Sequence, residues 1–121
     1  MRNAVIGFAA VIAASVPAVS AGAHAFLSQA VPPVGGMVSA PPQQIRLRFS
    51  EGIEPVFSNI ELATAQGQPI QIGPAAVNPG DNTELILSVP HLGPGRYKVT
   101  WQVVSVDTHR TEGAFNFEVK P

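Results

Sequence analysis

After residue 23 the sequence is built of short segments in which apolar and polar residues alternate, and proline or glycine separates these segments. Successive side chains of a β-strand point to opposite faces of its sheet, so this period of two predicts half-buried strands. The helical period of 3.6 residues is nearly absent. We expect seven strands, at residues 26–31, 44–50, 58–63, 69–72, 83–89, 96–106 and 113–120, with residues 73–82 as a loop.

Seven short strands in about 98 residues, with turn signals between them, are typical of a β-sandwich. A second motif supports this class, because Tyr97 follows Gly93-Pro94-Gly95 and enters the longest predicted strand. It resembles the tyrosine corner of Greek-key sandwiches, in which the tyrosine hydroxyl bonds to the backbone a few residues upstream. We therefore expect an all-β protein, with one immunoglobulin-like Greek-key β-sandwich of about seven strands over residues 24–121.

The first 23 residues differ in composition, because 16 of them are apolar. The apolar run at residues 4–19 follows Arg2 and is short for a membrane span, which needs roughly 20 residues. It ends in Ala21-Gly22-Ala23, which fits the pattern of a signal-peptidase site. We predict that residues 1–23 are a cleaved secretory signal peptide, and that no membrane anchor is left after cleavage.

The position of the cut decides which residue begins the mature chain. Cleavage after Ser20, Ala23 or Ala25 satisfies the rule of small residues around the cut. A cut after Ala23 makes His24 the first residue, whereas a cut after Ala25 removes this histidine.

Charge and cysteine content exclude several function classes. Without Arg2 the chain has six basic and eight acidic residues, whereas nucleic-acid binding needs a clustered basic face. The sequence contains no cysteine, so disulfides, thiolate metal sites and cysteine nucleophiles are excluded. It also contains no G-x-S-x-G, glycine-rich phosphate loop or H-E-x-x-H motif. We expect a protein that is not an enzyme.

Asp107 and His109 follow directly on the longest predicted strand. Residues two apart in an extended segment point to the same side, so both side chains would face one ion. His24, as the first residue of the mature chain, would add its α-amine and its imidazole. Three nitrogens and one carboxylate oxygen suit Cu(II) or, less often, Ni(II), and Zn(II) accepts the same donors in a tetrahedron.

Each of these residues also has a simpler interpretation. An isolated D-x-H motif is often a solvated pair, and a histidine at the start of a mature chain is often there by chance. Glu51, at the end of a predicted strand, is a solvated acid, an axial ligand or an acceptor that orients the terminal amine. His91 has no carboxylate near it in sequence and is interpreted as a surface histidine.

Five blocks of sequence then point to one family. They are H-A-F-L at residues 24–27, L-R-F-S-E at 47–51, L-G-P-G-R-Y-K-V-T-W at 92–101, V-S-V-D-T-H at 104–109 and G-A-F at 113–115. In this order they resemble the CopC family of periplasmic copper-resistance proteins over almost all of the 98 residues. The resemblance implies a periplasmic Cu(II)-binding protein, active in copper resistance or homeostasis, that hands copper on. Its site would use His24, Asp107, His109 and Glu51, and its partner would be an inner-membrane transporter of the CopD type.

One departure from the family is informative. Some members hold Cu(I) in a loop rich in methionine, whereas the only methionines here are Met1 and Met37. One thioether cannot build a site of soft ligands, so we expect a site for Cu(II) alone. Two other functions stay open at this point: a copper enzyme with a histidine brace, and an immunoglobulin-like interaction module without metal.

Overall fold

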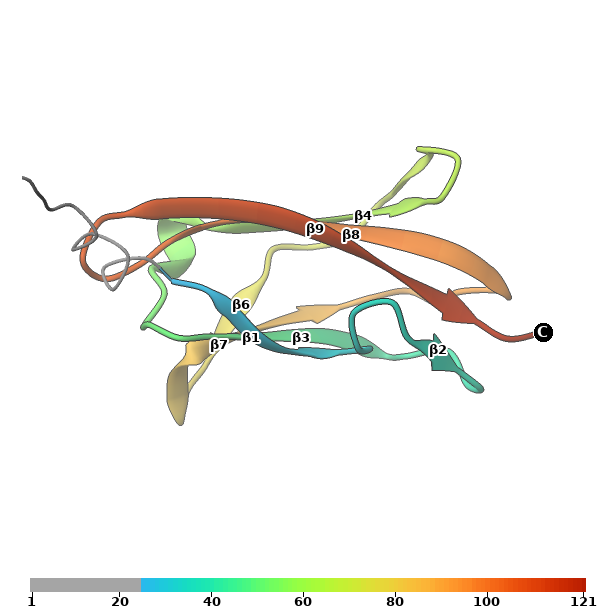
Figure 1. Ribbon diagram of the computed structural model, residues 1–121, viewed down its shortest axis with the longest axis horizontal. Helices are drawn as coiled ribbons and strands as arrows, with labels where there is room; N and C mark the ends of the chain where they lie inside the picture. Colours follow the sequence, from blue (N-terminus) through green and yellow to red (C-terminus); the bar gives the residue numbers. More distant parts are fainter. Residues whose placement is uncertain (1–24) are drawn as a thin grey trace, which may run out of the picture.

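The computed structural model of the protein describes residues 25–121 and shows two β-sheets packed face to face (Figure 1). The first sheet contains β1 (Leu27–Val31), β3 (Gln44–Phe49), β6 (Ala76–Asn78) and β7 (Asp81–Ser88). The second contains β2 (Met37–Val38), β4 (Asn59–Thr64), β5 (Pro69–Ile70), β8 (Gly95–Val104) and β9 (Arg110–Val119). A turn of 3-10 helix, η2 (Pro55–Phe57), connects β3 to β4. Over residues 25–121 no helix has the length and apolarity that a membrane crossing requires.

The order of the strands is that of an immunoglobulin-like sandwich. It runs β1-β3-β7-β6 in the first sheet and β2-β9-β8-β4-β5 in the second. The β2–β9 pair is parallel and the others are antiparallel. The all-β sandwich expected from the sequence is confirmed, with all seven expected strands present. The short strands β2 and β6 were not expected, because two or three residues are too few to show alternation, and β6 lies in the expected loop 73–82.

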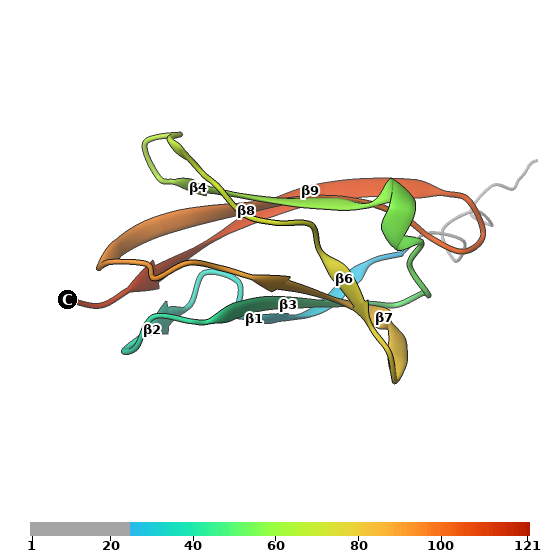
Figure 2. The same cartoon turned by 180° about the vertical axis from the view of Figure 1, so that it is seen from behind.

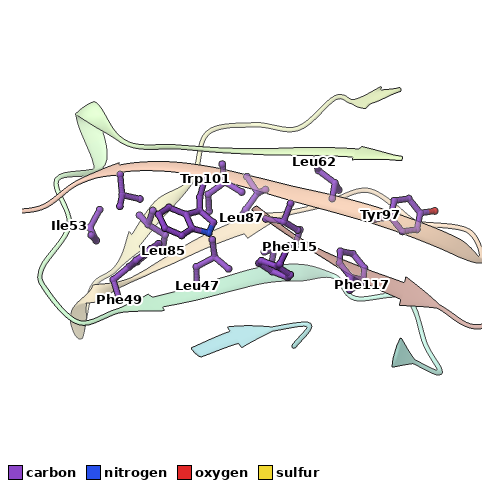
Figure 3. Packing of buried hydrophobic residues seen from close by; sticks show 14 of the residues in the cluster. Leu47, Phe49, Ile53, Leu62, Leu85, Leu87, Tyr97, Trp101, Phe115 and Phe117 are labelled. Carbon is purple, nitrogen blue, oxygen red and sulfur yellow. The ribbon is translucent and has the colours of Figure 1, made fainter. Parts of the chain in front are cut away.

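Both sheets turn their apolar residues toward the space between them (Figure 3). The first sheet contributes Ile45, Leu47, Phe49, Leu85 and Leu87, and the second contributes Ile60, Leu62, Tyr97, Val99, Trp101, Val103, Phe115, Phe117 and Val119. Phe49 and Trp101 meet edge to face across this space, with ring centroids 5.3 Å apart. Burial of these side chains from both sheets is the main favourable contribution to folding.

Two details of β8 fix the hairpin that it forms with β9. The hydroxyl of Tyr97 donates a hydrogen bond to the carbonyl oxygen of Gly93 at 2.7 Å, so the predicted tyrosine corner is confirmed. Trp101 pairs with Gly113 of β9, and a Cβ on Gly113 would lie 2.5 Å from the indole ring. The missing side chain at residue 113 therefore makes room for the tryptophan.

The outer face of the first sheet carries a cluster of charged residues around Glu84, which is only 6% exposed. Arg46 donates to both oxygens of this carboxylate, at 3.2 and 3.0 Å, and Asn78 donates to Oε1 at 2.8 Å. Arg48 lies further away, at 3.8 Å from Oε2. The hydrogen bonds from Arg46 and Asn78 lower the pKa of Glu84 despite the opposing effect of its burial.

Candidate metal site

The turn between β8 and β9 carries Asp107 and His109, at the end of the sandwich where β1 begins and η2 lies (Figure 2). We expected the strand to continue to Val106 and the next residues to be extended. That expectation is wrong, because β8 ends at Val104 and Thr108 has a left-handed backbone with φ of 73°. The chain has to reverse direction here so that β9 can pair with β8.

Ser105 fixes the base of this turn to the core. Its N–H donates to the carbonyl oxygen of His109 at 2.9 Å, and its carbonyl oxygen accepts the N–H of Thr108 at 2.8 Å. Ser105 is fully buried and forms an isolated bridge with Ile53 of the segment that follows β3. The tip of the turn is exposed, but its base is held by the sandwich.

The side chains of Asp107 and His109 converge at the tip. Nδ1 of His109 lies 3.3 Å from Oδ1 of Asp107, and the backbone N–H of His109 donates to the same oxygen at 3.3 Å. The side chain of Asp107 is 35% exposed and that of His109 is 45% exposed, so an ion in solvent can reach both. The turn therefore presents a nitrogen donor and an oxygen donor side by side.

Asp107 is held in its charged form. Its pKa is lowered, chiefly because the hydroxyl of Ser105 donates to Oδ1 and further because His109 donates to the same carboxylate. Partial burial opposes this shift without reversing it. A carboxylate must be deprotonated to bind a metal ion, so Asp107 meets this requirement at neutral pH.

Glu51 lies in the segment after β3, and the backbone brings this segment to the same end of the molecule. The N–H of Val106 donates to the carbonyl oxygen of Gly52 at 2.9 Å. However, no three His, Cys, Asp or Glu side chains within residues 25–121 form a group that could hold a metal ion. The structure therefore brings Asp107 and His109 together, but not Glu51 with them as a third ligand.

His24 and the predicted cleavage site lie outside the described residues. The first described residue, Ala25, is 1% exposed, and its carbonyl oxygen accepts a hydrogen bond from the hydroxyl of Thr111 at 2.9 Å. The N–H of Phe26 donates to Oγ of Ser50 at 2.9 Å. The start of the described chain is thus fixed beside the first residues of β9, close to the D-x-H turn.

His91 and Ser105 differ in their distance from the D-x-H turn. His91 is exposed in the loop that leads into β8, so the ten residues of β8 separate it from the D-x-H turn. Ser105, in contrast, contacts Asp107 directly, and we did not predict this from the sequence. Its position two residues before an aspartate was the available signal, because serine and aspartate side chains often bond within a turn.

The chain matches a known protein family and a relative over most of its length. The CopC domain family matches residues 27–120 of this chain. Protein YobA from Escherichia coli is 40% identical to it over 112 residues, which are 92% of this chain and 90% of that protein.

Two solved structures have similar folds. The crystal structure of CopC from Methylosinus trichosporium matches with a TM-score of 0.77 at 36% identity, over 81% of this chain and 95% of that chain. The crystal structure of PcoC, a methionine rich copper resistance protein from Escherichia coli, matches with a TM-score of 0.70 at 30% identity. That match covers 80% of this chain and 99% of the other.

Proposed function

The chain belongs to the CopC family of copper resistance proteins, and from this we propose that residues 24–121 bind Cu(II) in the periplasm and hand it on. The proposed ligands are His24, Asp107 and His109. The observation that carries the proposal is the convergence of Asp107 and His109 at 3.3 Å on a turn held by the core. Copper is the cargo of this protein, which performs no catalysis.

The position of Ala25 supports the contribution of His24. Ala25 is tied to Thr111, and Thr111 is two residues from His109, or about 7 Å along a strand. The Cα of a neighbouring residue lies only 3.8 Å from that of Ala25. A mature chain that begins at His24 would therefore have its α-amine and its imidazole within reach of the D-x-H turn.

The donor set supports Cu(II) as the cargo. Nitrogen and oxygen donors in a tetragonal arrangement suit Cu(II), whereas Cu(I) is bound by thioethers and thiolates. The sequence has no cysteine, and Met37 is the only methionine of residues 24–121. Met37 pairs with Glu118 near the far end of β9, so nearly the whole length of β9 separates its sulfur from His109. We propose a site for Cu(II) without a second site for Cu(I).

Glu51 supports the site from the neighbouring loop. The hydrogen bond between Val106 and Gly52 holds that loop against the D-x-H turn. We propose that the Glu51 carboxylate accepts a hydrogen bond from the terminal amine and so orients this ligand. Glu51→Gln should then weaken Cu(II) binding by about 10-fold to 100-fold, the range for residues that orient a ligand.

The proposed partner is a copper transporter of the CopD type in the inner membrane. The D-x-H turn supports such a transfer, because it lies at the tip of the sandwich and its two donors are exposed to solvent. Copper transfer to a purified transporter, compared between the parent and His109→Ala, would test the partner. Equal transfer by both would contradict a route through this site.

The first experiment is an intact mass of the exported protein, which tests whether the mature chain begins at His24. A Cu(II) titration of that protein should show one equivalent retained after desalting and a d–d absorption band. A matched sample with one glycine added before His24 should lose most of its affinity, because the α-amine is displaced from the chelate. Equal binding by both samples would contradict the proposed use of the amine.

The alternative of a copper enzyme with a histidine brace is tested on the same samples. Peroxide formation with a reductant should stay at the level of free copper in buffer. Turnover that is lost in His109→Ala would contradict the carrier function.

A further inference from the structure

Ser105 lies between the buried strand β8 and the exposed turn that carries the proposed metal ligands Asp107 and His109. It has no exposed surface, and its hydroxyl donates to Oδ1 of Asp107 and lies 3.3 Å from the carbonyl oxygen of His109. Its backbone is fixed on both sides, by the hydrogen bond to His109 and by the bridge to Ile53. A group in this position can set the orientation of the donors without reaching the ion itself.

The hydrogen bonds of Asp107 fall on one oxygen only. Oδ1 accepts the hydroxyl of Ser105 and the N–H of His109, and it faces Nδ1 of the same histidine. Oδ2 accepts no hydrogen bond from any residue in the range 25–121. Since a carboxylate oxygen has two lone pairs and these three groups already surround Oδ1, Oδ2 is the oxygen left for an ion.

The same contact selects one nitrogen of His109. Nδ1 lies against Oδ1 of Asp107 at 3.3 Å, so the proton of the neutral ring belongs on Nδ1. The lone pair is then on Nε2, which points away from this contact. Contact of one ring nitrogen with a carboxylate commonly fixes the tautomer and orientation of a metal-binding histidine.

We propose that Ser105 is the positioning residue of the copper site: its buried hydroxyl holds Asp107, and through it His109, so that Oδ2 and Nε2 face the ion. This inference rests on the proposed function, because it assigns a role toward the same Cu(II). The lowered pKa of Asp107 agrees with this role, since its largest cause is the hydrogen bond from Ser105.

Ser58 provides a matched control at the same end of the molecule. Its hydroxyl also makes two hydrogen bonds, to the carbonyl oxygen of Glu54 at 2.7 Å and from the N–H of Val104 at 3.0 Å. It supports the last residue of β8 without a hydrogen bond to Asp107 or His109. A loss of general stability at this end should therefore appear in Ser58→Ala as well as in Ser105→Ala, whereas a loss of positioning should appear only in the latter.

The first test needs no copper. Long-range ¹H–¹⁵N NMR spectra of the metal-free domain, recorded where the histidine rings are neutral, report the tautomer of His109. We expect the Nδ1–H form in the parent and in Ser58→Ala, and a mixture of tautomers in Ser105→Ala. Ser105→Thr keeps a hydroxyl and should restore the Nδ1–H form. An Nε2–H tautomer in the parent overturns the proposal, even if the variants do not fold.

The second test uses Cu(II) itself. Ser105→Ala should weaken binding by about 10-fold to 100-fold and change the electron paramagnetic resonance spectrum of bound Cu(II), whereas Ser58→Ala should change affinity by less than about threefold. Equal affinity and equal spectra in the parent and Ser105→Ala overturn the positioning role and leave the proposed function intact. A parent that does not bind Cu(II) overturns the proposed function, and the tautomer comparison then still decides whether Ser105 orients the turn.

Discussion

Glu84 and Asp107 are both carboxylates whose pKa is lowered by hydrogen bonds, but they differ in how many of their oxygens those bonds occupy. Glu84 is 6% exposed and accepts hydrogen bonds at both oxygens, from Arg46 and Asn78. The side chain of Asp107 is 35% exposed, and its hydrogen bonds within residues 25–121 all fall on Oδ1. Glu84 is thus satisfied inside the protein, whereas Asp107 keeps one oxygen for a partner from outside.

The difference shows what a lowered pKa does and does not indicate. It says that a carboxylate is ionised, and it says so for both residues. The role depends on the partners. Glu84 faces two arginines, which neutralise it, whereas Asp107 faces His109, which we propose as a second metal ligand. The oxygens that remain open therefore separate a carboxylate that stabilises the fold from one that is available for binding.

The largest expected effect is on copper binding. Asp107→Ala and His109→Ala should each weaken Cu(II) binding by more than about 100-fold, because each removes a donor atom and not only a neighbour that orients one. The measurement is a competition titration against a chelator of known affinity. His91→Ala is the control, since His91 is exposed at the other end of β8, and it should bind as the parent does. If Asp107→Ala bound Cu(II) as the parent does, the open oxygen of Asp107 would have no role in binding, and Asp107 would not differ from Glu84 in this respect.

The next effect is on stability. Glu84→Ala should lower the free energy of unfolding by about 2 to 3 kcal/mol, because Arg46 and Asn78 lose their buried acceptor. Its Cu(II) affinity should stay within about threefold of the parent. Glu118→Ala is the control: its partner Arg96 is 3.7 Å away and 72% exposed, so the loss should stay below about 1 kcal/mol. Chemical denaturation measures both, and equal losses would contradict the structural role of Glu84.

The stability contribution of Glu84 and Cu(II) binding at the D-x-H turn should be lost in different ranges of pH. The pKa of Glu84 in the folded state lies below its unfolded value of about 4.3, so its contribution to stability is complete above that pH and is lost as pH falls through the folded pKa. The pKa of Asp107 is also lowered in the folded state, so its contribution to stability is likewise lost as pH falls through the folded pKa. Cu(II) binding should weaken at a higher pH than this, because the donors must lose their protons to bind the ion and the α-amine already takes up a proton below about pH 8. Circular dichroism and a Cu(II) titration over the same range test this, and simultaneous loss of fold and copper would contradict it.

The smallest expected effect concerns the backbone of the turn. Thr108 has a φ of 73°, which is unfavourable for a β-branched residue and acceptable for asparagine. Thr108→Asn should therefore raise the free energy of unfolding by about 0.5 kcal/mol and leave Cu(II) affinity unchanged. Thermal melting and titration of this variant check both. A large loss of affinity would show that the hydroxyl of Thr108, which bonds to the carbonyl of Asp107, also supports the site.

Much of the fold followed from the sequence because alternation directly encodes which face of a strand is buried. The stripe of Tyr97, Val99, Trp101 and Val103 is buried as expected. The burial of Glu84 was not predictable, because it depends on Arg46 and Asn78 from neighbouring strands, and a single sequence does not show which residues face each other across strands.

The site was predicted less completely for similar reasons. Asp107 and His109 do converge, but through a turn closed by Ser105 and not through an extended strand. A turn with a left-handed threonine has no clear sequence pattern, so the role of Ser105 emerged only from the hydrogen bonds. His24 and the cleavage after Ala23 lie outside the described residues and stay predictions.

The hydrogen bond between Thr111 and Ala25 has a consequence for the whole sandwich, because it joins the entrance of β1 in one sheet to β9 of the other. Immunoglobulin domains often connect their sheets by a disulfide, and this chain has no cysteine. Copper bound by His24 and the D-x-H turn would close the same seam as a removable cross-link. The loaded domain should then melt at a higher temperature, by mass action, and the cargo itself would strengthen its carrier until it is passed on.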